Sequence, residues 1–203
     1  MGKTKVALLG GGFNPIALHH ENIAKLIWDR TRMPTWFMPC FRHRFAKNDE
    51  LLVSSHRWNM VSEVTNQYPE RMRAFDWEIT REFDGSMWTA MDELDKVHGD
   101  KYDFHITIGM DNANIIETEW HHGDFLIQRF PFIVMERNGT EPKVDWFRKK
   151  QHQVLPFNDM ISSSEIRECI AAGKHSFAKR HLNPQVWDYI VAGRLYGYQG
   201  AER

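Results

Sequence analysis

Short apolar runs alternate with amphipathic stretches along this chain. Runs such as residues 5–9, 35–38 and 102–108 have the length and the β-branched or aromatic content of buried strands. Further short strands are expected at residues 73–78, 130–136 and 154–155, the first of them at a sheet edge. Helices are expected between the strands, at residues 19–30, 57–65, 86–97, 112–117, 164–172 and 183–192.

This alternation favours an α/β fold, a Rossmann-like doubly wound parallel sheet with helices on both faces. The 203 residues are expected to form a single domain, 1–203. Ligands on such sheets bind beyond the carboxyl ends of the strands, where loops lead into helices. The informative residues should therefore lie just after each strand.

Charge and composition narrow the possible partners. The chain has 26 basic and 27 acidic residues, a formal charge of −1, which argues against a nucleic-acid surface. Its two cysteines, Cys40 and Cys169, have no metal-ligand spacing and form no disulfide framework. No apolar run reaches the roughly 18 residues that a membrane span needs. We expect a cytoplasmic protein without membrane, nucleic-acid or protein-held metal partners, whose anion site is local.

The loop after the first expected strand is rich in glycine. Gly10, Gly11 and Gly12 break the strand, Phe13-Asn14-Pro15 follow, and His20 lies in the first turn of the next helix. Glycines let the backbone approach a ligand closely, and a helix start offers unpaired N–H groups at the positive end of its dipole. A glycine triplet alone is more often a tight turn, but with the histidine it predicts a phosphate site.

A second loop, near the end of the chain, repeats this chemistry with serines. Ile161-Ser162-Ser163-Ser164-Glu165 precedes a helix that carries Arg167. Such a run is also an ordinary N-terminal capping pattern. Hydroxyls at a helix start can equally form an anion cradle, and an arginine one turn later adds a bidentate phosphate grip. We expect the two loops to converge.

Both loops resemble motifs of one nucleotidyltransferase superfamily, Gly-x-Phe-(Asp/Asn)-Pro-x-His-x-x-His and Ile-Ser-Ser-Thr-x-x-Arg. The resemblance implies a nucleotidyltransferase-type fold in which His20 and Arg167 are catalytic. Ser164 stands where threonine is usual and keeps the hydroxyl. The residues that the resemblance places at the ATP phosphates or the adenine side are Gly11, Gly12, Phe13, Asn14, Ser163, Ser164 and Arg137.

The chain departs from the first motif at a catalytic position, because Ala17 stands where the family has its first histidine. His19 is expected to point to the opposite helix face, since two residues rotate a helix by about 200°. Losing one preorganised donor costs on the order of 10²–10³ in rate. Either the enzyme is weakened, by nature or by design, or other groups compensate; Ala17→His is expected to raise activity at least tenfold.

Segments in the middle of the chain resemble the nicotinate/nicotinamide mononucleotide adenylyltransferase family. Trp120 lies in a polar loop, which favours stacking on a pyridine ring over a place in the core. Basic residues of charged loops often only face solvent. The residues that the resemblance places at the mononucleotide are Lys47, Arg57, Trp88, Thr89, Gly109, Asp111 and Trp120.

The resemblance implies that ATP and a pyridine mononucleotide are joined to an NAD-type dinucleotide with release of pyrophosphate. The 5′-phosphate of the mononucleotide is already ionised, so no protein nucleophile is needed and alignment of two polyanions is the main task. Mg²⁺ is expected to be carried by the ATP phosphates. The sequence leaves open the choice between nicotinate and nicotinamide and the formation of a homo-oligomer. Two alternative functions remain: a non-catalytic nucleotide-binding protein, or a nucleotidyltransferase for another phosphate substrate.

Overall fold

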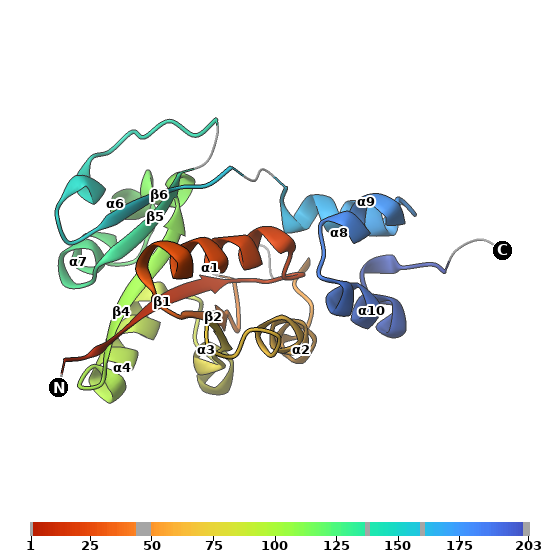
Figure 1. The fold of residues 1–203 in the computed structure, drawn as a ribbon, viewed down its shortest axis with the longest axis horizontal. Helices are drawn as coiled ribbons and strands as arrows, with labels where there is room; N and C mark the ends of the chain where they lie inside the picture. Colours follow the sequence, from red (N-terminus) through yellow and green to blue (C-terminus); the bar gives the residue numbers. More distant parts are fainter. Residues whose placement is uncertain (1, 44–49, 137–138, 159–160, 201–203) are drawn as a thin grey trace.

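The computed structural model describes residues 2–43, 50–136, 139–158 and 161–200, which contain one six-stranded sheet (Figure 1). All neighbouring strands are parallel, in the order β3-β2-β1-β4-β5-β6. The strands are β1 (Thr4–Gly11), β2 (Thr35–Pro39), β3 (Met72–Ala74), β4 (Tyr102–Gly109), β5 (Phe132–Glu136) and β6 (Gln153–Pro156). The expected doubly wound parallel sheet is confirmed.

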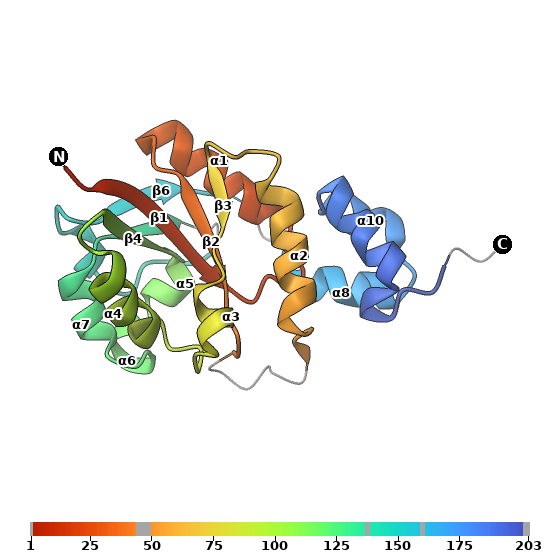
Figure 2. The same ribbon diagram turned by 90° about the horizontal axis from the view of Figure 1, so that it is seen from below.

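Helices cover both faces of the sheet, with α1 and α2 on the side opposite α3, α4 and α7 (Figure 2). The α-helices are α1 (Leu18–Thr31), α2 (Ser54–Thr65), α3 (Trp77–Arg81), α4 (Met87–His98), α5 (Met110–Ala113), α6 (Ile116–Glu119), α7 (Gly123–Arg129), α8 (Ser163–Ala171), α9 (His175–Arg180) and α10 (Pro184–Gly193). Two 3₁₀ turns are η2 (Trp146–Arg148) and η3 (Leu195–Gly197). Within the described ranges, no helix combines the length and the apolar character that spanning a membrane requires.

The strict alternation of side chains along β1 explains the two layers. Val6 and Leu8 pack with α4 and the α5–α7 segment, whereas Leu9 packs with α1 and α2. All three are at most 7% exposed, so β1 is buried on both faces. A strand buried in this way reads as a continuous apolar run, which is why its sequence signal is strong.

The order of the strands reverses beside β1. The chain moves outward from β1 through β2 to β3, then returns to β4 on the other side of β1 and moves outward again to β6. In a sheet of this type the crevice at such a reversal, outside the carboxyl ends of the strands, is where ligands bind. The ends of β1 and β4 are therefore the place to look for a site.

Several expected boundaries are wrong, each for a local reason. The strand expected at 73–78 ends at Ala74, and Trp77 and Glu78 begin α3 instead. The strand β1 continues through Gly10 and Gly11 because both pair with β2. The strand expected from residue 130 starts only at Phe132.

The helical regions of the second half also differ from expectation. One helix was expected at 112–117, but α5 and α6 are separate. The Asn114 side chain donates to the carbonyl of Glu141 and accepts from the amide of Lys143, so it anchors a loop at this break. The helices α7 and α9 were missed, since seven and six residues carry too little periodicity to recognise.

Candidate active site

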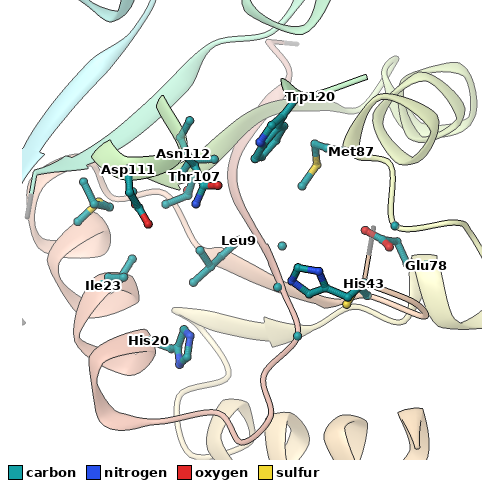
Figure 3. Close-up of a pocket in the computed structure, with 18 of the residues that line it drawn as sticks. Leu9, His20, Ile23, His43, Glu78, Met87, Thr107, Asp111, Asn112 and Trp120 are labelled. Atoms are coloured by element: carbon teal, nitrogen blue, oxygen red, sulfur yellow. The ribbon is translucent and has the colours of Figure 1, made fainter. Parts of the chain in front are cut away.

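A cavity of about 320 Å³ opens at the carboxyl ends of β1 and β4, at the reversal of strand order. In Figure 3, His20 projects from α1 on one side, Asp111 and Trp120 come from the end of β4 and beyond, and Glu78 and His43 lie across from α1. The residues that line it are Leu9, Gly10, Gly11, Gly12, His19, His20, Ile23, Cys40, Arg42, His43, Glu78, Gly85, Ser86, Met87, Thr107, Ile108, Gly109, Asp111, Asn112, Trp120, His121, Met135 and Phe157.

Gly10, Gly11 and Gly12, called the glycine turn from here on, line the cavity at the end of β1. A Cβ on Gly10 would lie 2.7 Å from Cε of Met87, so the bare backbone is what allows this close approach. Phe13 follows with a positive φ of 46° and is buried, with its ring 5.1 Å from the His20 ring. Phe13 thus packs edge-on against the His20 ring and does not line the cavity itself.

The two motif loops converge, as the sequence predicted. Arg167 donates from Nη1 to the carbonyl of Asn14 at 2.9 Å, and Ser163 donates from Oγ to the carbonyl of Pro15 at 2.9 Å. Ser162 caps α8 through the amide of Glu165, so the capping reading of this run is also correct. Arg167, Ser163 and Ser164 do not line the cavity as it stands, and their contact with phosphates stays a prediction.

Arg167 also forms an ion pair with Glu50, at 2.6 Å between Nη2 and Oε2. The Asn14 side chain binds the same segment, donating to the carbonyl of Glu50 and accepting from the amide of Leu52. Tyr196 donates its hydroxyl to the same Asn14 oxygen at 2.9 Å. Asn14 is only 6% exposed and here joins three distant segments of chain.

The start of α1 corrects the expectation that His19 points away from the phosphate site. Ala17 is the N-cap, with an extended backbone (φ −127°, ψ 167°), and the helix begins only at Leu18. The rotation of a regular helix therefore does not separate position 17 from position 19. His19 lines the same cavity as His20, and their Nε2 atoms are 3.1 Å apart. Ala17 itself is 2% exposed and packs in the core beside Phe13.

The wall opposite α1 comes from the segment after β4. Gly109, Asp111 and Trp120 line it, as expected, together with Asn112 and the hydroxyl-bearing Thr107. Three buried polar atoms of the lining, Thr107 Oγ1, Trp120 Nε1 and Glu78 Oε2, have no hydrogen-bond partner among the described residues. Buried polar groups without partners are uncommon, so three of them around one cavity set this region apart from an ordinary core.

Glu78 and Cys40 line the side of the cavity that faces α1, and burial raises the pKa of both side chains. Burial, reinforced by the charge of Asp84, raises the pKa of Glu78 to about 8, so this carboxyl is mostly neutral at pH 7. Burial also raises the pKa of Cys40 to about 11, which keeps its thiol protonated. A protonated thiol is a poor nucleophile, which fits a reaction that needs no covalent enzyme intermediate.

Other expected mononucleotide residues are not brought to the cavity. Arg57 is fully buried and donates to the carbonyls of Leu52, Gly12 and Phe41. Trp88 packs on His122, and the amide of Thr89 is capped by Ser86. Lys47, expected at the mononucleotide, and Arg137, expected at the adenine side, both lie outside the described residues, so their roles stay predictions.

Sequence reasoning missed several lining residues, for different reasons. Cys40, Arg42 and His43 follow the second strand, so the rule about strand ends could have found them. Glu78 and Ser86 were expected only as the last residue of a strand and the first residue of a helix. Met135 and Phe157 carry no chemical signal in the sequence. Asn112 and His121 flank residues that were recognised.

Comparisons with known proteins identify the family of this chain. The cytidylyltransferase-like family model matches residues 8–169. The chain is 30% identical over 198 residues to a protein of Salinibacter ruber named probable nicotinate-nucleotide adenylyltransferase, covering 94% of this chain and 97% of that one. The chain belongs to the nicotinate-nucleotide adenylyltransferase family. A relative of the same name from Carboxydothermus hydrogenoformans is 28% identical over 207 residues, 97% of this chain and 100% of its own.

Solved structures give the same fold for this family member. The Plasmodium falciparum nicotinic acid mononucleotide adenylyltransferase complexed with NaAD superposes with a TM-score of 0.81 at 22% identity, over 98% of this chain and 99% of that one. A putative nicotinate-nucleotide adenylyltransferase from Vibrio parahaemolyticus gives a TM-score of 0.68 at 16% identity, over 97% of each chain. The fold of the family is therefore shared across nearly the whole chain.

Proposed function

We propose that this chain transfers the adenylyl group of MgATP to nicotinate mononucleotide, giving nicotinate adenine dinucleotide and pyrophosphate. One observation carries the proposal: two loops with phosphate-binding motifs, from opposite ends of the chain, meet beside one cavity whose far wall holds Asp111 and Trp120. The names of the relatives support nicotinate over nicotinamide. The complexes of the Plasmodium falciparum enzyme with NaAD and with APC support a dinucleotide product and an ATP-side ligand.

The reaction balances without a protein nucleophile. An oxygen of the mononucleotide 5′-phosphate forms a bond to the α-phosphorus of ATP, the bond from that phosphorus to the bridging oxygen of the β-phosphate breaks, and pyrophosphate leaves with both electrons. The protein contributes alignment and stabilisation of the charge that develops on the phosphoryl oxygens. In this proposal the amides of Gly11 and Gly12 and the ring of His20 face the triphosphate, with Arg167 close behind.

The remaining groups are assigned to the two substrates. Trp120 would stack on the pyridine ring, and Asp111 would accept hydrogen bonds from ribose hydroxyls. No three His, Cys, Asp or Glu side chains among the residues the structure describes come together as a metal site. We propose that Mg²⁺ is instead carried to the site by the phosphates of ATP, because Mg²⁺ commonly binds through substrate oxygens.

The test is direct synthesis. The purified chain is incubated with ATP, Mg²⁺ and either nicotinate or nicotinamide mononucleotide, and dinucleotide and pyrophosphate are quantified. We expect both products in equal amounts, with kcat/KM for nicotinate mononucleotide at least about tenfold higher, and a loss of about 10²-fold in His20→Ala. Trp120→Ala should raise KM for the mononucleotide about tenfold, because base–aromatic stacking contributes about 1–3 kcal/mol.

Ala17 favours a second candidate, a nucleotide-binding protein without catalysis. ATP binding without either dinucleotide, unchanged by Ala17→His, would support that candidate and overturn the enzyme. Product with glycerol phosphate or pantetheine phosphate instead would indicate another branch of the superfamily. A single-domain chain and a cytoplasmic location also belong to the proposal, and limited proteolysis and cell fractionation test them. Light scattering decides between a monomer and a homo-oligomer.

A further inference from the structure

Two adjacent histidines at the start of α1 face the cavity together. The Nε2 atoms of His19 and His20 are 3.1 Å apart, and their ring centroids are 3.8 Å apart with an angle of 39° between the planes. Both side chains line the cavity beside the glycine turn. Residues adjacent on a regular helix diverge by about 100°, and in the first turn of α1 both side chains turn to the same cavity.

We propose that His19 replaces the histidine missing at position 17, and that His19 and His20 bind the nucleotide triphosphate as a pair. The inference rests on the proposed adenylyl transfer and deepens it by naming the second imidazole donor of the site. Ala17 is buried in the core and does not line the cavity, so the chain has moved the donor by two residues instead of losing it.

Hydrogen bonding assigns the protons of the pair. The amide of Ala17 lies 3.1 Å from Nδ1 of His20, and an amide can only donate, so Nδ1 is an acceptor and a neutral His20 carries its proton on Nε2. That proton points at Nε2 of His19, which accepts it when His19 is neutral. While His20 donates this proton to His19, both Nε2 atoms can donate to a ligand only if His19 is in its Nε2–H tautomer or the pair takes up one additional proton.

An arriving polyphosphate supplies the reason to take up that proton. A phosphate oxygen near the two Nε2 atoms stabilises the charged pair and is bound by charge-assisted hydrogen bonds. The other titratable groups that line the cavity modulate this uptake. These groups are Cys40, Arg42 and His43 at the end of β2, Glu78 on α3, Asp111 on α5 and His121 before α7.

An anion explains the pair better than a metal ion does. Among the described residues no third His, Cys, Asp or Glu joins the two imidazoles in a metal-binding geometry. The glycine turn beside them offers backbone N–H groups, which bind anions and not cations. Phe13 holds the His20 ring edge-on at 5.1 Å, so one member of the pair is fixed in place.

The first experiment removes the donor and then tries to return it. Variants His19→Ala, Ala17→His and the double variant are compared with the unmodified chain by kcat and KM for ATP at saturating nicotinate mononucleotide. We expect His19→Ala to lose about 10²-fold in kcat/KM for ATP. Because position 17 does not line the cavity, Ala17→His should change it by less than about threefold, both alone, in contrast to the tenfold gain expected from the sequence, and in the His19→Ala background.

His181→Ala serves as the matched control, because His181 lies beside the start of α1 but its ring packs on Phe177 outside the cavity. Its activity should stay within about twofold of the unmodified chain. If His19→Ala keeps more than a third of the unmodified kcat/KM, the inference is wrong. Position 17 is buried and has little room for an imidazole, so the decision rests on His19→Ala and on the following measurement.

Calorimetric binding of ATP and of inorganic tripolyphosphate tests the pair without turnover. In buffers of different ionisation enthalpy, we expect the unmodified chain to take up close to one proton at pH 7.5, and His19→Asn to take up less than half of that and bind about tenfold more weakly. Equal uptake and affinity would overturn the inference. A chain that binds ATP through His19 but forms no dinucleotide would refute the proposed function and leave the pair intact.

Discussion

Arg57 is the largest side chain that is fully buried in the described part of the molecule, and its role differs from the one the family resemblance implies. Its guanidinium donates to the carbonyls of Leu52, Gly12 and Phe41, at 2.8, 2.9 and 3.3 Å. Burial lowers the pKa of this group, and the three carbonyls offset part of that cost. The side chain therefore fixes the glycine turn through the carbonyl of Gly12, without lining the cavity itself.

We expect Arg57→Lys to lower the free energy of unfolding by about 2–4 kcal/mol, because an ammonium cannot reach three carbonyls in different directions. Chemical denaturation measures this. Arg42→Lys, at an exposed position on the cavity rim, should change stability by less than about 0.5 kcal/mol. If Arg57→Lys keeps its stability and only raises KM for the mononucleotide, the contact that the resemblance implies is correct after all.

At the scale of the elements, α1 and α10 are held together by one buried amide. The Asn183 side chain accepts from the amide of Gln185, which caps α10, and donates to Oε1 of Glu21 on α1 at 2.9 Å. Glu21 is only 2% exposed and also pairs with Lys25. The closing helix, far in sequence from the glycine turn, thus helps to hold the helix that carries His19 and His20.

Asn183→Ala should cost about 2–4 kcal/mol, since it removes a helix cap worth about 1 kcal/mol and a hydrogen bond to a charged group worth about 1.5–3 kcal/mol. Asn183→Ser keeps a capping oxygen and loses the contacts of the side-chain amide with Glu21 and Gln67. It should therefore be about 1 kcal/mol more stable than Asn183→Ala in urea denaturation. Equal stability of the two variants would mean that the cap contributes nothing.

At the scale of the whole molecule, two buried groups far apart set opposite slopes in the dependence of stability on pH. The pKa of Glu78 is raised from 4.5 to about 8, chiefly by burial, so between these values the folded state holds a proton that the unfolded state has lost. Stability therefore falls as pH rises through this window, by up to about 1.4 kcal/mol per pH unit. Below pH 4.5 this penalty is absent.

His152 acts in the other direction. Burial, with the charge of Lys149, lowers the pKa of His152 from 6.5 to about 4, and its Nδ1 accepts from the amide of Phe132. Between these values only the unfolded state is protonated, so stability falls as pH falls from 6.5 towards 4. The two slopes offset each other between pH 4.5 and 6.5, and Glu78 alone acts from 6.5 to 8.

Thermal unfolding between pH 4 and 9 checks both slopes. We expect the melting temperature of the unmodified chain to decline from pH 6.5 to 8. Glu78→Gln should abolish that decline, because its amide has no charge to bury. His152→Asn, which keeps an acceptor near the Nδ1 position, should remove the loss of stability on the acid side. A Glu78→Gln curve parallel to the unmodified one above pH 6.5 would contradict the assignment.

The local pattern of the chain was enough to predict the parallel sheet and the positions of most of its strands. The middle of β1 is buried on both faces, so Val6, Ala7, Leu8 and Leu9 are apolar in succession, and that signal is local. The motif loops were recognisable for a similar reason: a close backbone approach needs glycine, and a helix start needs a capping hydroxyl, wherever they occur.

Only the tertiary structure decided which of these residues face the cavity. Whether a side chain such as Arg57 meets a substrate or three carbonyls depends on loops distant in sequence, and no local pattern encodes that. The place of His19 depended on where α1 begins, a boundary that moves by a residue or two on small differences in capping. The sequence by itself determined the parallel sheet and the two phosphate-binding motif loops. The tertiary structure decided the strand order, and with it the switch point, as well as the donors, because direction in space is a property of the assembled chain.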